Sequence, residues 1–352
     1  MRILTVVGAR PQFIKASPLS RALRQAHQEI LLHTGQHYDY EMSKVFFEEL
    51  GIPEPARNLG VGSASHGEQT GAMLQRIEEV LFEEGPDLVL VYGDTNSTLA
   101  GALAAVKLHI PVAHVEAGLR SFNRDMPEEI NRVLTDHAST LLLCPTSTAV
   151  QNLAQEGITS GVHNVGDVMY DAVLRNVKLA EQRSSILSKL EVDPGSYVLT
   201  TVHRPRNTDH RARLISILEA LNQAAEPIVF PAHPRTQQAI DRIDYSLGPH
   251  VRFTKPVGYL DMLALEKSAR MILTDSGGVQ KEAYFLGTPC ITLREETEWT
   301  ETLLGGWNVL AGADRDKILS LLRSHEPDSE RQAVFGDGRA SQRILAVLER
   351  AL

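Results

Sequence analysis

Short runs of β-branched residues alternate with helical patterns along this 352-residue chain, and this alternation limits the fold more than any other feature. A strand followed by a helix and another strand forms a βαβ unit, whose strands run parallel. The sequence therefore predicts an α/β fold of doubly wound parallel sheets. The first strand and helix pairs are expected at 3–7 with 14–23, 30–33 with 42–50, 88–91 with 97–107, and 112–115 with 128–135.

The length of the chain and a restart of this rhythm predict two domains. A chain of 352 residues, 43% of them hydrophobic, exceeds what one core usually holds. A helix over 170–189 and a turn at 193–195 precede new strands at 197–202, 227–230, 251–254 and 271–273. We expect a first domain of residues 1–170 completed by a C-terminal helix at 338–352, and a second domain of residues 171–337.

Composition narrows the classes of function. The formal net charge of −9 argues against a nucleic-acid partner. Apolar runs are too short to span a bilayer, and the N-terminus has the pattern of a strand rather than of a secretion signal, so a cytoplasmic protein without membrane association is expected. Cys144 and Cys290 lie at the edges of apolar runs, which favours buried free thiols over a disulfide or a metal site.

A glycine-rich turn after the strand at 271–273 predicts a phosphate site. Ser276, Gly277 and Gly278 open a helical segment, where backbone N–H groups and the positive end of the helix dipole favour an anion. Glu282 lies one turn beyond Gly278, so its carboxylate can reach the hydroxyls of a ribose. The alternative is a tight strand-to-helix turn that binds no ligand.

Three carboxylates are candidates for acid/base chemistry. Asp94 and Glu116 follow successive predicted strands, so they are expected at the same edge of one sheet. Glu128 begins a predicted helix, and Arg132 lies four residues further along the same face. Capping of a helix is the alternative for Asp94, and stabilisation of the helix dipole is the alternative for Glu128. Burial of Glu116 between apolar neighbours requires a compensating partner or substrate.

Basic residues also follow predicted strands. Arg10 and Lys15 come after the first strand, and His203 and Arg204 close the first strand of the second domain. Together they would neutralise a diphosphate held at Ser276. The alternative for Arg10 and Lys15 is a solvated position in the first turn of a helix.

The remaining histidines and motifs give weaker evidence of function. His114 and Glu116 share a strand face and are a candidate metal pair, but no third ligand lies nearby in the sequence. For His233, in Pro231-Ala232-His233-Pro234-Arg235, a structural role is favoured over a functional one. The sequence has neither a Walker-type loop nor a G-x-G-x-x-G fingerprint after a strand, which disfavours kinases of that class and nicotinamide dehydrogenases.

Six motifs along the chain together resemble the non-hydrolysing UDP-N-acetylglucosamine 2-epimerases. The resemblance implies a glycosyltransferase-B-like fold of two Rossmann-like domains with a substrate cleft between them, a homodimer, and neither a metal nor a nicotinamide cofactor. The motifs are Gly8-Ala9-Arg10-Pro11 with Lys15, Gly93-Asp94-Thr95, His114 to Arg120, Pro127-Glu128-Glu129 with Asn131-Arg132, His203-Arg204 with Asn207, and Ser276 to Ala283.

The resemblance also implies a reaction and roles for the candidate residues. Such enzymes invert carbon 2 of a UDP-sugar by eliminating UDP to give a glycal and adding UDP back, with protonation on the opposite face. The implied substrate is UDP-N-acetylglucosamine, the product is UDP-N-acetylmannosamine, and cell-surface polysaccharide biosynthesis is the expected use. The resemblance assigns Asp94, Glu116, Glu128, His203, Lys15 and Arg132 to catalysis, and Arg10, Arg204, Ser276, Gly277, Gly278 and Glu282 to binding of the UDP portion.

Departures from the family pattern leave the substrate open. Many bacterial members carry Thr-Glu-Arg-Pro where this chain has Thr297-Glu298-Trp299-Thr300. They also carry Gln-Glu-Glu where this chain has Gln280-Lys281-Glu282, and a Glu where it has Arg206. These departures resemble the branch that epimerises UDP-2,3-diacetamido-2,3-dideoxyglucuronate. The charges of Lys281 and Arg206 would suit a carboxylate on the sugar, or they lie on the surface.

A regulatory second-substrate site found in some members matches this chain only at Gln36-His37. Two further classes stay open. One is a retaining glycosyltransferase of the same fold, and the other is a nucleotide-sugar-binding protein without catalysis.

Overall fold

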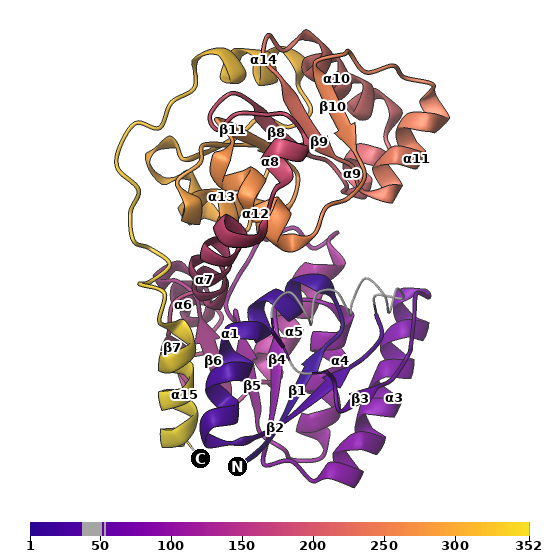
Figure 1. Ribbon diagram of the computed structural model, residues 1–352. Coiled ribbons are helices and arrows are strands. Elements are labelled where there is room, and N and C mark those ends of the chain that lie inside the picture. Colours follow the sequence, from indigo (N-terminus) through magenta and orange to yellow (C-terminus); the bar gives the residue numbers. More distant parts are fainter. Residues whose placement is uncertain (37–50, 53, 352) are drawn as a thin grey trace. The chain divides into compact units, whose positions relative to one another are not determined.

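The computed structural model of the chain describes residues 1–36, 51–52 and 54–351, with the exception of the Arg10 side chain. The chain divides into two compact units: unit 1 comprises Met1–Leu174 with Ala333–Leu352, and unit 2 comprises Arg175–Gln332. Each unit is built on its own parallel sheet (Figure 1). The helix expected at 42–50 lies outside the described residues. Among the described helices, none is both long enough and apolar enough to cross a membrane.

The sheet of unit 1 has the strand order β3-β2-β1-β4-β5-β6-β7 within the described residues, and every neighbouring pair is parallel. Its central strands are apolar on both faces because helices cover both faces. The strands are β1 (Arg2–Val7), β2 (Gln28–His33), β3 (Arg57–Asn58), β4 (Leu88–Tyr92), β5 (Val112–Val115), β6 (Leu141–Cys144) and β7 (Val162–Asn164).

Helices α3 and α4 cover one face of this sheet, and α1 with α15 covers the other (Figure 1). Gly101 of α4 allows a close approach to the sheet, since a Cβ there would lie 3.1 Å from Cγ1 of Val91 and 3.3 Å from Cγ2 of Val6. The helices of unit 1 are α1 (Arg10–Ala26), α3 (His66–Glu84), α4 (Asn96–Lys107), α5 (Pro127–Ala138), α6 (Ser147–Gln155) and α15 (Ala340–Ala351), and α7 (Val168–Arg183) begins in unit 1 and continues into unit 2.

Helix α15 returns to unit 1 at the end of the chain and packs beside α1, in yellow and indigo in Figure 1. Asp171 of α7 fixes its first turn by accepting hydrogen bonds from the backbone N–H groups of Ala340 (3.0 Å) and Ser341 (2.8 Å). The apolar side of α15 is anchored by Ile344 and Leu348, which are fully buried.

The sheet of unit 2 has the strand order β10-β9-β8-β11-β12-β13, also parallel throughout. A buried cluster that includes Leu214, Ile217, Phe230 and Leu273 joins α10 to the strands. The elements of unit 2 are α8 (Ile186–Lys189), β8 (Val198–Thr201), α9 (Pro205–Thr208), α10 (Arg211–Gln223), β9 (Ile228–Pro231), α11 (Pro234–Ile243), β10 (Val251–Thr254), α12 (Tyr259–Ser268), β11 (Met271–Thr274), α13 (Gly277–Leu286), β12 (Cys290–Thr292), the 3₁₀ segment η1 (Thr300–Gly306), β13 (Asn308–Leu310) and α14 (Arg315–Ser324).

The predicted fold class of parallel, helix-covered sheets is confirmed. One predicted element is divided: the single helix expected over 170–189 becomes α7, which ends at Arg183, and α8, which begins at Ile186. The side chain of Ser184 explains the break, because its hydroxyl accepts a hydrogen bond from the backbone N–H of Ile186 (3.3 Å) and so competes with helix continuation.

The strand orders locate the ligand edge of each sheet. Strand β1 lies between β2 and β4, and β8 lies between β9 and β11, so the chain direction across each sheet reverses at these points. Ligands of doubly wound sheets bind beyond the carboxyl ends of the strands at such reversals. The segments that follow β1, β4 and β5 in unit 1, and β8 and β11 in unit 2, carry most of the candidate residues.

Candidate active site

Asp94, two residues after β4, forms an ion pair with Arg132 of α5. Its Oδ2 accepts hydrogen bonds from Nη2 (2.7 Å) and Nε (3.0 Å) of Arg132. The Asp94 side chain is 29% exposed, whereas that of Arg132 is 3% exposed, so the carboxylate keeps access to solvent while its partner is held inside. The capping alternative for Asp94 is wrong, since Thr95 is the N-cap of α4 and its hydroxyl accepts from Thr98 N–H.

Glu116, the residue after β5, is buried and forms an ion pair with Lys15 of α1. This is the compensating partner that the sequence requires, and it shows that the solvated alternative for Lys15 is wrong. Glu116 has a φ of +74°, a left-handed conformation that costs on the order of 1–3 kcal/mol for a residue other than glycine. Gly93 leaves room for the pair, because a Cβ there would lie 3.1 Å from both Lys15 Nζ and Glu116 Oε2.

Glu128 and Glu129 stand in the first turn of α5 but in different surroundings. Glu128 is exposed, as expected of a residue that stabilises the helix dipole. Glu129, which sequence reasoning did not select, is buried and accepts hydrogen bonds from the N–H groups of Ser121 and Phe122 (2.9 Å each) and from Arg132 Nη1 (2.6 Å). Burial acts to raise the pKa of Glu129, but these donors outweigh it and lower that pKa. Arg132 is therefore fixed between Asp94 and Glu129.

His114 of β5 is fully buried, and both of its ring nitrogens are engaged. Nδ1 lies 2.7 Å from Oδ1 of Asp136, and Nε2 lies 2.7 Å from the carbonyl oxygen of Gly93. The candidate metal pair of His114 and Glu116 is therefore wrong. Among the residues that the structure describes, no group of three His, Cys, Asp or Glu side chains has the geometry of a metal site.

The predicted phosphate turn in unit 2 has the expected form. Ser276 is the N-cap of α13, its hydroxyl accepts from Val279 N–H, and Gly277 and Gly278 begin the helix. The space beside Gly277 is close to two other side chains, since a Cβ there would lie 2.6 Å from Glu298 Oε1 and 3.4 Å from Trp299 Nε1. Packing therefore favours glycine at 277.

Asp275 joins the two strand ends at the reversal of the second sheet. Its buried carboxylate accepts hydrogen bonds from the backbone N–H groups of His203 (3.0 Å) and Arg204 (3.0 Å) and from Asn207 Nδ2 (3.0 Å). This clamp brings the turn after β8 beside the start of α13. Asp275 was missed from the sequence, although a buried acid directly after a strand is the same signal that selected Glu116.

The side chains of that turn lie partly in solvent. The His203 side chain is 40% exposed, with its ring centroid 6.0 Å from that of His233, and Nη2 of Arg204 is 3.7 Å from Glu298 Oε1. His233 is the N-cap of α11, and its Nδ1 accepts from Arg235 N–H (3.2 Å), which agrees with a structural role.

Two charged residues of α13 are buried. Glu282, the candidate ribose ligand, is 4% exposed. Lys281 is 1% exposed, and its Nζ lies 3.8 Å from the ring centroid of Trp299. The surface alternative is therefore wrong for Lys281. It is correct for Arg206, whose exposed side chain pairs with Glu295 (3.2 Å).

The candidate residues form two groups, one in each unit. In unit 1, Lys15, Asp94, Glu116 and Arg132 come together around Gly93, with Glu128 exposed at the start of α5. In unit 2, His203 and Arg204 lie beside the turn of Ser276, Gly277 and Gly278, with Glu282 on the same helix. The Arg10 side chain and His37 lie outside the described residues. Gln36 accepts a hydrogen bond from Ser97 Oγ (2.7 Å).

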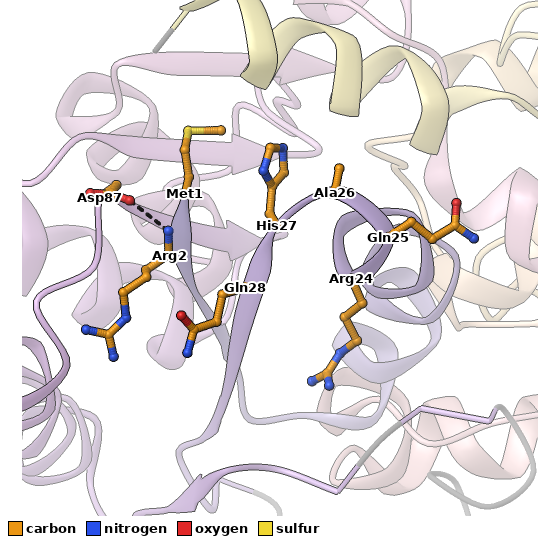
Figure 2. Close-up of a pocket in the computed structure, with 8 residues that line it drawn as sticks. All are labelled: Met1, Arg2, Arg24, Gln25, Ala26, His27, Gln28 and Asp87. Carbon is orange, nitrogen blue, oxygen red and sulfur yellow. Dashed lines mark hydrogen bonds between the residues drawn. The ribbon is translucent and has the colours of Figure 1, made fainter.

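A cavity in unit 1 lies away from these groups, at the edge of the sheet where β1 and β2 begin (Figure 2). Its residues serve local structure: the N–H of Arg2 donates to Asp87 (2.7 Å), and Arg24 pairs with Glu29 (2.8 Å). Because parallel sheets bind ligands at the opposite edge, this cavity does not compete with the candidate site. The remaining residues that line it are Met1, Gln25, Ala26, His27 and Gln28.

Comparison with known proteins bears directly on this arrangement. Residues 21–349 match the family model of UDP-N-acetylglucosamine 2-epimerase. The chain is 56% identical to a UDP-N-acetylglucosamine 2-epimerase homolog of Methanococcus maripaludis and 50% identical to the UDP-2,3-diacetamido-2,3-dideoxy-D-glucuronate 2-epimerase of Pseudomonas aeruginosa, in each case over 99% of both chains.

A solved structure gives the same result. The crystal structure of Methanocaldococcus jannaschii UDP-GlcNAc 2-epimerase in complex with UDP-GlcNAc and UDP is 45% identical and superimposes with a TM-score of 0.92, covering 99% of this chain and 100% of that one. Agreement in sequence and in structure along nearly the whole length leads to one conclusion. This chain belongs to the UDP-N-acetylglucosamine 2-epimerase family.

Proposed function

We propose that the chain interconverts UDP-N-acetylglucosamine and UDP-N-acetylmannosamine by inverting carbon 2 of the sugar. The observation that carries the proposal is a pair of carboxylates, Asp94 and Glu116, each held beside a cation at the carboxyl edge of the first sheet, in a member of this family.

The reaction has two balanced halves. A base removes the proton from carbon 2, the C1–O bond breaks, UDP leaves with the electron pair, and a C1–C2 double bond forms. In the second half an acid protonates carbon 2 on the other face, and the UDP oxygen attacks carbon 1. Such chemistry needs proton-transfer groups on both faces of the ring and cations beside the departing diphosphate.

Unit 1 would supply the proton-transfer groups. Two Arg132 donors fix Oδ2 of Asp94 and so hold the orientation of the carboxylate. Because the side chain is partly exposed, a substrate can reach it. We assign Asp94 as the base and Glu116 with Lys15 as a second proton-transfer pair. Glu128, at the exposed start of α5, is the third candidate acid.

Unit 2 would hold the UDP portion. The amides at Ser276, Gly277 and Gly278 and the partly exposed Arg204 suit a diphosphate, and His203 beside them would stabilise its charge as it departs. Glu282, four residues past Gly278, would bind the ribose. Arg10 is assigned to the diphosphate on the family motif, and both groups are proposed to act on one substrate molecule.

A second substrate stays open because the chain is 50% identical to the Pseudomonas UDP-2,3-diacetamido-2,3-dideoxy-D-glucuronate 2-epimerase. The charge argument for that substrate is weakened by the structure. Lys281 lies under the Trp299 ring, and Arg206 pairs with Glu295 on the surface.

Incubation with each UDP-sugar in deuterated water tests the proposal. An epimerase exchanges the carbon 2 proton for deuterium, whereas a glycosyltransferase or a binding protein leaves it in place. Asp94→Asn should abolish exchange while UDP still binds by calorimetry. Asp87→Asn, at the amino end of the same strand, is the matched control and should exchange normally. Wild-type protein that exchanges neither substrate would refute the function, and exchange by Asp94→Asn would remove Asp94 from the mechanism.

The quaternary state, the domain limits and the location complete the proposal. A homodimer is supported by Phe82, Val106 and Leu134, apolar side chains exposed by 70%, 39% and 46% on the successive helices α3, α4 and α5. Light scattering should give twice the chain mass.

We also propose that the first functional domain comprises residues 1–170 with 338–352 and the second comprises residues 171–337. The enzyme is proposed to act in the cytoplasm, where nucleotide sugars are made.

A further inference from the structure

A row of four ionisable side chains, His114, Asp136, Arg120 and Glu156, crosses unit 1, and only Glu156 at its end is partly exposed. Asp136 Oδ1 lies 2.7 Å from His114 Nδ1, and Asp136 Oδ2 accepts from Arg120 Nη1 (2.7 Å). Arg120 then donates to both carboxylate oxygens of Glu156 (2.7 and 2.8 Å). The proposed reaction uses none of these residues, and His114, Asp136 and Arg120 are at most 4% exposed.

The contacts of His114 fix the orientation of its ring. The carbonyl oxygen of Gly93 carries no proton, so His114 Nε2 must donate to it. Burial acts to raise the pKa of Asp136, but His114 and Arg120 outweigh burial and lower it. The His114 ring is therefore held between the Gly93 carbonyl and the Asp136 carboxylate.

The same row ties together the two turns that carry the candidate carboxylates. Gly93 directly precedes Asp94, and its carbonyl accepts from His114. Gly118 lies two residues past Glu116, and its N–H donates to Asp136 Oδ2 (3.1 Å).

The turn after β5 needs such a restraint. Glu116 has a φ of +74°, and a left-handed residue other than glycine persists only where the surroundings hold it. Gly118 is also clasped from α6, because Asn152 Nδ2 donates to its carbonyl (2.9 Å).

We propose that His114 is a positioning residue for epimerisation: it fixes the Gly93 carbonyl on one side and, through Asp136, the Gly118 amide on the other, and so sets the relation between Asp94 and Glu116. The inference rests on the proposed function. Within this row, His114 forms no hydrogen bond with Asp94 or Glu116. Its proposed role therefore differs from that of an acid or a base. Two further titratable groups face the row: His137, which lies 3.4 Å from Glu156, and Cys144, which is close to Asp136 and Arg120.

Three variants test the inference. His114→Phe removes both contacts of the ring nitrogens, and His114→Gln keeps one donor for the Gly93 carbonyl. His163→Gln, in β7 of the same sheet, is the matched control. At a temperature where all variants are folded by circular dichroism, we expect kcat to fall about 100-fold for His114→Phe and about 10-fold for His114→Gln, the range expected from a misplacement near 1 Å. The KM and the Kd for UDP should change less than twofold, and His163→Gln should match the wild type.

A second measurement does not depend on catalysis. In ¹⁵N-histidine-labelled wild-type protein, the His114 ring, assigned by its loss in His114→Gln, should show a protonated Nε2, the donor to the Gly93 carbonyl. This measurement keeps the inference testable if His114→Phe does not fold.

A failure of this inference can be distinguished from a failure of the proposed function. Wild-type protein without exchange at carbon 2 refutes the proposed function, whatever the ring spectrum shows. Wild-type exchange combined with an unchanged kcat in His114→Phe overturns the inference, as does a His114 ring with an unprotonated Nε2 in active enzyme. A loss of kcat that only follows the fraction of folded protein would also overturn it, since that is the result of a purely structural residue.

Discussion

Lys281 and Trp299, two positions at which this chain departs from the family pattern, contact each other. We therefore predict that their contributions to the free energy of unfolding are coupled. Lys281 Nζ lies 3.8 Å from the Trp299 ring centroid, and the residues are 1% and 4% exposed. A desolvated cation–π contact is worth about 2 kcal/mol, against about 0.5–1 kcal/mol at the surface. We therefore expect a coupling free energy near 2 kcal/mol between these positions, roughly a 30-fold change in the folding equilibrium.

A double-mutant cycle isolates this coupling from the packing that each substitution also removes. Lys281→Met, Trp299→Leu and the double variant are unfolded in urea. Tryptophan fluorescence is the signal, because both tryptophans of the chain, Trp299 and Trp307, lie in unit 2. Trp307 remains as the probe when Trp299 is replaced, so the measurement reports one unit and does not require the whole chain to unfold in one step.

The control and the refuting result are both specific. A cycle between Lys281→Met and Trp307→Leu should give a coupling near zero. Restoring the bacterial residues at both positions, Lys281→Glu with Trp299→Arg, should recover stability lost in Lys281→Glu alone, because an ion pair replaces the cation–π contact. A Lys281 and Trp299 coupling below about 0.5 kcal/mol, the lower limit for exposed pairs, would refute this reasoning.

Three other predictions follow from buried groups. Gly277→Ala should weaken UDP binding at least about tenfold by calorimetry, since its Cβ would meet a carboxylate oxygen at 2.6 Å, whereas Gly71→Ala in an open part of α3 should leave binding unchanged. Burial raises the pKa of the Cys144 and Cys290 thiols to about 12, so neither should react with Ellman's reagent at pH 8 until urea is added; rapid native labelling would contradict this. The pKa of Glu129 is lowered from 4.5 in the folded state, so its stabilising effect is complete above pH 4.5 and is lost as the pH falls through the folded value. The difference in urea midpoint between wild type and Glu129→Gln should therefore shrink from pH 7 to pH 4, and a constant difference would show that the ion pairs of Glu129 do not stabilise the fold.

Periodic apolar runs made the sheets predictable. The strands expected at 112–115 and 251–254 coincide with β5 and β10, because β-branched runs between turn residues specify strands locally. Helix α3 was not predicted, although its sequence carries the signal. Its buried residues Gln69, Met73, Ile77, Val80 and Leu81 recur at helical spacing, Ser65 caps its first turn, and Gly85 ends it in a left-handed conformation.

The residues of the site were predictable to the extent that position along a strand determines them. Asp94, Glu116 and Lys15 were selected because each follows a strand, and the structure places them around Gly93. The pairing of Arg132 with Glu129, and the role of Asp275 as a clamp, depend on contacts across the fold. Spacing alone favours Glu128 and Glu129 equally, and only tertiary packing decides which of them is buried.

The return of α15 to unit 1 has a consequence for synthesis on the ribosome. Since α15 covers α1 and buries Ile344 and Leu348, unit 1 stays incomplete until α15 has emerged, long after α1 has been translated. Unit 2 is continuous in sequence and can close earlier. A nascent chain therefore carries an uncovered apolar surface on α1 until α15 is made, and truncation before residue 340 would make that exposure permanent.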